Sequence, residues 1–159
     1  MNGTDCLQSC RQRGFSLIPL RQRSKVPLVK WKDYHLSDKD FLRFLGQDVN
    51  WAIRCDENFH ALDFDDKETY SRFVKENGQV LENAPTVRTS RGYHVWFKPQ
   101  KPVSSFKSDG IEVKGLGSLV VIPPSIHPSG AVYHFEKPIN GKFPEMDIEG
   151  LLNVGAVTP

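Results

Sequence analysis

Residues 60–65 read His-Ala-Leu-Asp-Phe-Asp, and the interpretation of the whole chain starts from this stretch. Apolar and acidic residues alternate here, and successive side chains of a β-strand point to opposite faces, so the pattern predicts a strand. Leu62 and Phe64 would face the core, while Asp63 and Asp65 would share the other face. Two neighbouring carboxylates repel each other unless a cation lies between them, and hard oxygen ligands suit Mg²⁺ or Mn²⁺. The stretch therefore predicts a metal site on a strand.

The sequence on either side of this strand predicts an α+β domain. Asp65 or Asp66 is also a good N-cap for a helix over residues 67–76, and this role is the alternative to metal binding. Ser37 is the expected N-cap of a helix through residue 45, with an inward face formed by Phe41, Leu42 and Leu45. We further expect a helix over residues 4–13 and strands over residues 15–20, 50–54, 86–89, 93–98, 110–114, 118–122 and 131–135.

A second polar group is the run Ser90-Arg91-Gly92-Tyr93-His94, in which a tight basic turn leads into a strand. Alternation places His94 and Trp96 on one face of that strand. A histidine beside Ser90 and Arg91 could hold a triphosphate, because charged and hydroxyl donors bind phosphate oxygens strongly. The alternative is a histidine that is satisfied within the core.

A third acidic residue occurs in Gly110-Ile111-Glu112-Val113-Lys114, where alternation buries the apolar residues and places Glu112 beside Lys114. Glu112 is a candidate metal ligand and Lys114 a candidate phosphate contact; the alternative is an ion pair on an edge strand. A buried strand over residues 118–122 then enters a rigid Pro-Pro turn that presents Ser125 and His127. The alternative for this turn is a purely architectural role.

Bulk properties limit the classes of protein to be considered. The chain has 159 residues, of which 38% are hydrophobic and 25% charged, as in an ordinary globular domain. We find no apolar run near the roughly 18 residues that span a bilayer and no secretory signal, and we expect a cytoplasmic protein without membrane contact. The net charge is only +2, yet residues 1–32 carry seven basic side chains and one acidic side chain. This basic segment is a candidate for contact with a polyanion.

The order of these motifs is more specific than any one of them. An Asp-x-Asp strand, a Ser-Arg-Gly-x-His turn, a Gly-Ile-acid-Val-basic-Gly strand and a Pro-Pro-Ser turn followed by His and Gly succeed one another. This order resembles the N-terminal domain of bifunctional DNA primase/polymerases, of the archaeo-eukaryotic primase superfamily, over about residues 10–137. Ser24-Lys25-Val26-Pro27 with Trp31 is similar to a further segment of that family.

The resemblance implies a fold and a set of site residues. The fold would be an RRM-like antiparallel sheet packed with a small αβ unit. Two divalent ions, Mg²⁺ or Mn²⁺, would be held by Asp63, Asp65 and Glu112, although the family usually has Asp at the position of Glu112. Nucleotide binding would fall to His94, Arg91 and Ser90, with Lys114, Lys25 and Ser125 as further candidates.

The implied activity is template-directed nucleotidyl transfer, as a DNA primase or polymerase in replication of a mobile element or a prokaryotic genome. Its partners would be a DNA template and primer, dNTPs or NTPs, and a downstream helical or helicase domain. Residues 1–150 would form the catalytic domain and residues 151–159 the start of a linker. The alternatives are a non-catalytic nucleotide- or nucleic-acid-binding module of a replication initiator, and a metal-dependent nuclease that uses the same acids.

Overall fold

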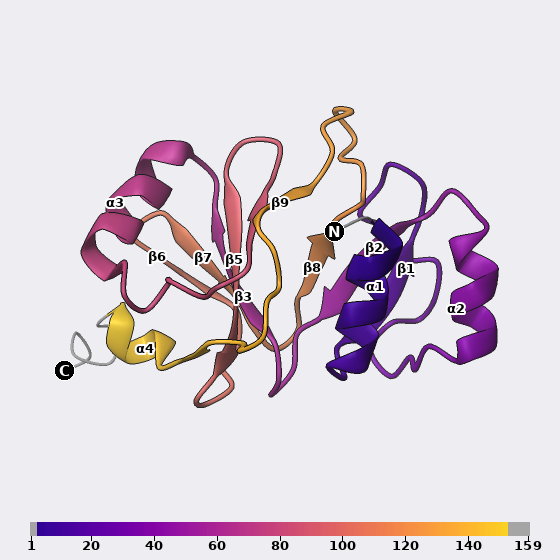
Figure 1. Cartoon of the computed structure of the whole chain (residues 1–159), viewed down its shortest axis with the longest axis horizontal. Coiled ribbons are helices and arrows are strands. Elements are labelled where there is room, and N and C mark those ends of the chain that lie inside the picture. The colour runs from indigo at the N-terminus through magenta and orange to yellow at the C-terminus, as the bar shows by residue number, and fades with distance from the viewer. Residues whose placement is uncertain (1–2, 153–159) are drawn as a thin grey trace.

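The computed structural model describes residues 3–152, which form a mixed α+β fold with two antiparallel sheets (Figure 1). The α+β class expected from the sequence is therefore confirmed. Figure 1 shows the layers from left to right: α3 and α4, a large sheet, a small sheet with α1 in front of it, and α2.

The small sheet has the strand order β1-β2-β8 and is built from β1 (Ser16–Leu20), β2 (Asn50–Arg54) and β8 (Leu119–Ile122). Two helices accompany it, α1 (Gly3–Gln12) and α2 (Asp38–Leu45). Ser37 caps α2, as predicted, because its side chain accepts a hydrogen bond from the backbone N–H of Asp40. These elements form the small αβ unit.

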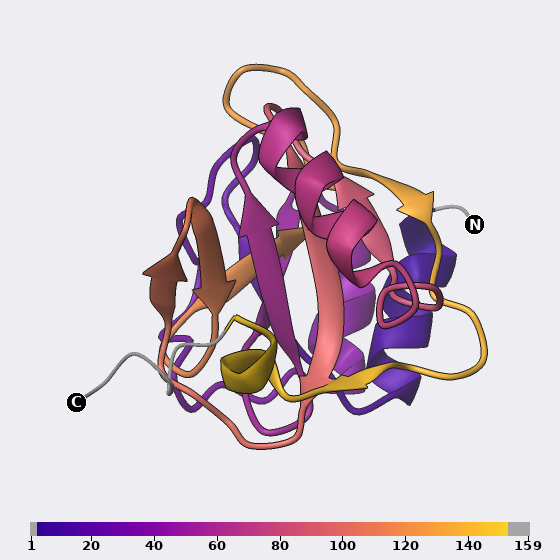
Figure 2. The ribbon, with the colours of Figure 1, turned by 90° about the vertical axis from the view of Figure 1, so that its left-hand side faces the viewer.

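The large sheet has the order β6-β7-β3-β5-β4-β9, with β10 pairing in parallel to β5. Its strands are β3 (His60–Phe64), β4 (Thr86–Arg88), β5 (Tyr93–Pro99), β6 (Phe106–Ser108), β7 (Ile111–Lys114), β9 (His134–Lys137) and β10 (Glu145–Met146). Helices α3 (Lys67–Asn77) and α4 (Ile148–Leu151) belong to this part of the chain. Figure 2 shows α3 lying across one face of this sheet, over β3 and β5.

Each face of the large sheet contributes to a different hydrophobic core. Leu62 and Phe64 of β3 pack with Phe73 of α3, whereas Ala61 of β3 and Trp96 of β5 pack toward the small αβ unit. The strict alternation along β3 thus separates the two cores, as the pattern of residues 60–65 predicted. Asp63 shares its face of the sheet with Ala61, the face that meets the small unit.

The structure corrects three details of the predicted elements. In α2 the inward residues are Phe41 and Phe44, which both contact the ring of Trp51, whereas Leu42 is 70% exposed. The strand expected over residues 131–135 begins only at His134. The strands β6 and β10 were not predicted. The proposed linker at residues 151–159 lies largely outside the described residues, and Leu151 closes α4.

Candidate functional site

A row of three polar residues crosses the centre of the large sheet. The strand register places Asp63 of β3 directly opposite His94 of β5 on one side and Glu112 of β7 on the other. Directly opposed residues share a face, so the three side chains emerge together toward the small unit. His94 is only 8% exposed, and its Nε2 atom lies 3.5 Å from Oδ1 of Asp63.

The charge of Asp63 is set by its surroundings. Burial raises the pKa of its carboxyl, but the hydrogen bond and charge of His94, together with Lys114 and Lys25, outweigh burial and hold the pKa below its ordinary value. Asp63 therefore stays a carboxylate at neutral pH although it is half-buried. A buried anion of this kind attracts cations, whether side chains or metal ions.

The two acids that follow β3 have separate roles. Asp66 is the N-cap of α3: its Oδ1 accepts a hydrogen bond from the backbone N–H of Thr69 at 2.7 Å. The capping alternative thus holds for Asp66. Asp65 remains exposed at the end of β3, on the lining of the same cavity as Asp63.

That cavity, of about 170 Å³, lies where the small unit and the large sheet meet. It brings together six of the nine predicted site residues: Lys25, Asp63, Asp65, Ser90, Arg91 and His94. Thr89, His127 and Tyr133 complete its lining. A larger hollow of about 580 Å³ beside α3 combines Arg72 with Glu76 and Asp109 but contains none of the predicted residues. The chemistry therefore concentrates in the smaller cavity.

The turn that carries Ser90 and Arg91 is pressed against the end of β3. The backbone N–H of Gly92 donates to Thr89 Oγ1 at 3.0 Å, and a Cβ atom on Gly92 would lie 1.7 Å from the carbonyl oxygen of Phe64. Only glycine permits this approach. The turn is consequently held against the end of β3, next to Asp65.

Several donors of the cavity have no partner of their own. Within residues 3–152, the side chains of Lys25, Ser90 and Arg91 make no hydrogen bond or ion pair. The Nδ1 atom of His94 is buried and unsatisfied. Lys25 and Arg91 are exposed, so both charges can meet an anionic ligand without first giving up a partner in the protein.

Glu112 and Lys114 lie outside this lining. Their side chains form an ion pair along β7, with Lys114 Nζ 3.3 Å from Glu112 Oε1, as the alternative interpretation expected. Glu112 is nevertheless the cross-strand neighbour of Asp63. No three acidic, histidine or cysteine side chains converge as a metal-binding group anywhere in residues 3–152.

Ser125 is placed differently from the other candidates. It is only 1% exposed, its hydroxyl donates to the carbonyl of Trp51 at 3.1 Å, and it accepts from the N–H of Trp51 at 2.8 Å. A hydroxyl occupied on both sides has no capacity left for a phosphate. Ser125 instead ties the Pro-Pro turn to β2.

Three lining residues were not among the predicted site residues: Thr89 of the basic turn, and His127 and Tyr133 after the Pro-Pro turn. Burial, and then the negative charge of Asp63, raise the pKa of Tyr133 to about 12. Burial, and then the positive charges of Lys25 and Arg91, lower the pKa of His127. The Pro-Pro turn that precedes them was the available signal, because such turns fix the direction of the loop that follows.

The chain is similar to a family of known proteins over most of its length. The family model for "Bifunctional DNA primase/polymerase, N-terminal" matches residues 7–146, most of the chain. No curated protein matches the chain. Within residues 3–152, no helix has the length and apolar character required to cross a membrane.

Proposed function

Because the chain belongs to the family of bifunctional DNA primase/polymerase N-terminal domains, we propose that it catalyses template-directed nucleotidyl transfer with nucleotides bound in the Asp63 cavity. The observation that carries this proposal is the juxtaposition of two carboxylates with unpaired phosphate-binding donors in one cavity. A triphosphate with its bound cations requires both kinds of group at once.

In this proposal Lys25, Ser90, Arg91 and His94 hold the triphosphate. Arg91 supplies a planar fork of donors and Lys25 a point charge, and both can reach phosphate oxygens without first breaking an ion pair. The Nε2 atom of His94 faces Asp63, and in the imidazolium form its Nδ1–H is left to donate to a phosphate oxygen.

The acidic residues fit a hard divalent cation by their chemistry, because Asp63 and Asp65 offer carboxylate oxygens to the same cavity. Glu112 would complete the set after leaving Lys114, and it is one methylene longer than the aspartate usual in the family. Bound Mg²⁺ or Mn²⁺ would neutralise charge on the attacking and leaving oxygens.

The reaction then needs no nucleophile from the protein. The 3′-hydroxyl of a primer, or of a first nucleotide, attacks the α-phosphorus; the new O–P bond forms as the bond to pyrophosphate breaks. The residues of the cavity contribute by holding the triphosphate in line for this attack. The rate enhancement comes from the positioning of the triphosphate and from charged groups that are already in place before the reaction, as in other phosphoryl-transfer sites.

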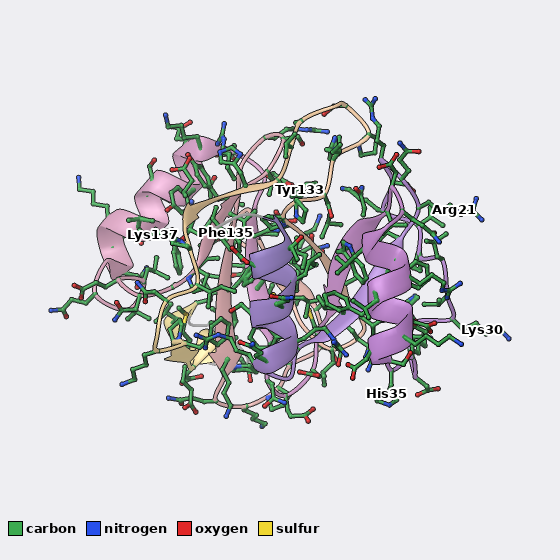
Figure 3. The ribbon with its side chains drawn as sticks, turned by 45° about the vertical axis from the view of Figure 1, so that its right-hand side comes forward. Arg21, Lys30, His35, Tyr133, Phe135 and Lys137 are labelled. Carbon is green, nitrogen blue, oxygen red and sulfur yellow. The ribbon has the colours of Figure 1, made fainter. Side chains whose placement is uncertain are left out.

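The template would follow the basic loop of residues 21–32. This loop contains five lysines and arginines and no acidic residue, and none of the five forms an ion pair within the described chain. Lys25 of the loop lines the cavity, while Figure 3 shows Arg21 and Lys30 projecting outward from the small unit. Such a strip suits the phosphate backbone of a DNA strand. A downstream helical or helicase domain remains part of the proposal for de novo priming.

The test is extension of a labelled primer on a DNA template with Mn²⁺, supplied with dNTPs or NTPs. We expect extension by the wild type and its loss in Asp63→Ala and Asp65→Ala, whereas Glu76→Ala, an exposed acid of α3, keeps it. Full activity of both aspartate variants would refute the assignment. Metal-dependent nucleotide binding without extension would favour the binding module, and degradation of the primer without nucleotides would favour a nuclease.

A further inference from the structure

The loop of residues 126–133, between β8 and β9, forms one wall of the cavity and comes from the side of the small unit. In Figure 1 it is the orange loop that rises above β8 and leads into β9. It contributes His127 and Tyr133 to the lining. No sequence motif assigned a role to Tyr133.

Hydrogen bonds to β2 hold this loop at its base. Besides the two bonds of Ser125 to Trp51, the amide of Asn50 accepts from the N–H of Ile126 at 3.0 Å and donates to its carbonyl at 2.7 Å. The backbone N–H of Tyr133 then donates to the carbonyl of Ser125 at 2.9 Å. The base of the loop is therefore fixed to the small sheet.

Tyr133 occupies the centre of this wall. Its ring centroid lies 6.2 Å from that of His94 and 6.2 Å from that of His127, so the tyrosine ring is a neighbour of both histidines. The residue is only 4% exposed, and its hydroxyl makes no hydrogen bond within residues 3–152. The hydroxyl is not cut off from solvent as His94 Nδ1 is, so it is open to a molecule that enters the cavity. Such a molecule can accept the hydrogen bond that no residue within 3–152 accepts.

We propose that Tyr133 is a nucleotide-binding residue whose hydroxyl donates a hydrogen bond to the triphosphate. This inference rests on the proposed function. It adds a contact from the 126–133 loop to the contacts proposed for Ser90 and Arg91, which lie on the turn between β4 and β5. A phenol is a donor at neutral pH and, unlike lysine or arginine, brings no charge. The Tyr133 hydroxyl can therefore lie near Asp63 and donate to the anionic ligand without neutralising the charge of Asp63 or of the ligand.

The phosphates are a better acceptor than the sugar because of what surrounds the hydroxyl. Lys25 and Arg91 line the same cavity as Tyr133, and two cationic side chains beside the carboxylates of Asp63 and Asp65 suit a phosphate group with its bound cation. The cavity lining is predominantly polar, with no aliphatic side chain to pack against a sugar or a base.

The test compares Tyr133→Phe with Tyr93→Phe by isothermal titration calorimetry, using inorganic tripolyphosphate and a dNTP, each with Mg²⁺. Tyr93 is the matched control because it is also buried, at 7% exposure, but lies on the opposite face of β5. Each variant removes one hydroxyl and keeps the ring, and its melting temperature verifies folding. We expect Tyr133→Phe to weaken binding of both ligands about tenfold, as for a hydrogen bond to a charged acceptor. Tyr93→Phe should bind as the wild type does.

Three results would overturn the inference. Unchanged tripolyphosphate binding by Tyr133→Phe would remove the contact while leaving the proposed function intact. Loss of dNTP binding alone would assign the hydroxyl to the sugar instead. A wild type that binds neither ligand and extends no primer would remove the proposed function and the inference together.

Discussion

Replacing Gly92 with alanine is expected to disable the site by displacing one turn. The added Cβ would lie 1.7 Å from the carbonyl oxygen of Phe64 and 3.0 Å from the carbonyl carbon of Asp65. Since Cβ contacts closer than 3.0 Å are essentially never seen, the turn must retreat by at least about 1.3 Å. It carries Ser90 and Arg91, and a displacement of about 1 Å can cost on the order of 100-fold in rate. Overpacking of this kind costs about 1–3 kcal/mol of stability, or roughly 3–10 °C in melting temperature.

The assay is primer extension at saturating template, with thermal melting followed by circular dichroism. Gly46→Ala is the matched control, because the nearest atom to its added Cβ is Arg43 O at an ordinary 3.6 Å. We expect the control to keep both activity and melting temperature. A Gly92→Ala variant that melts and extends as the wild type does would show that the turn tolerates a side chain, and the reasoning about its fixed position would be wrong.

Three further predictions concern charge and the buried turn. The pKa of Asp63 is lower in the folded state than in the unfolded state. Its contribution to stability is therefore present above the ordinary carboxyl pKa of about 4 and is lost as the pH falls through the folded pKa. Urea titrations from pH 3 to 6 should show this loss of stability in the wild type and a weaker loss in Asp63→Asn. Lys30→Ala and Lys32→Ala should each weaken binding of single-stranded DNA, and each should reduce the slope of the log binding constant against log salt concentration by about 0.7. Lys67→Ala on α3 should change neither the affinity nor the slope. Equal slopes in all variants would exclude the basic loop as a DNA contact. Ser125→Ala leaves a backbone N–H of β2 without its acceptor and should cost about 1–3 kcal/mol in urea unfolding, and a loss under about 0.5 kcal/mol would contradict that role.

The sequence was most informative where a local rule decides the outcome. A side-chain period of two assigned Asp63 and Leu62 to opposite faces, and it paired Glu112 with Lys114 on β7. The N-cap of α2 followed in the same way from Ser37. These features depend on residues close together in the chain, so no knowledge of the packing was needed.

Features set by distant contacts were not predictable in this way. The inward face of α2 is decided by the ring of Trp51, which contacts Phe44 and leaves Leu42 exposed. The strands β6 and β10 are only three and two residues long, and their pairing partners define them. Tyr133 lies in a run of β-forming residues, so its place in the cavity became visible only from the fold.

The crossing of the chain between the two sheets has a consequence for synthesis. The small sheet takes β1 and β2 from the first third of the chain, but its third strand, β8, follows β7 of the large sheet. A nascent chain that has emerged only as far as β2 therefore exposes a two-stranded ribbon with an open edge, and such ribbons are marginal in water. That edge stays available to other chains until β8 emerges. The β2–β8 pairing closes this edge at the same step that brings the 126–133 loop to the cavity.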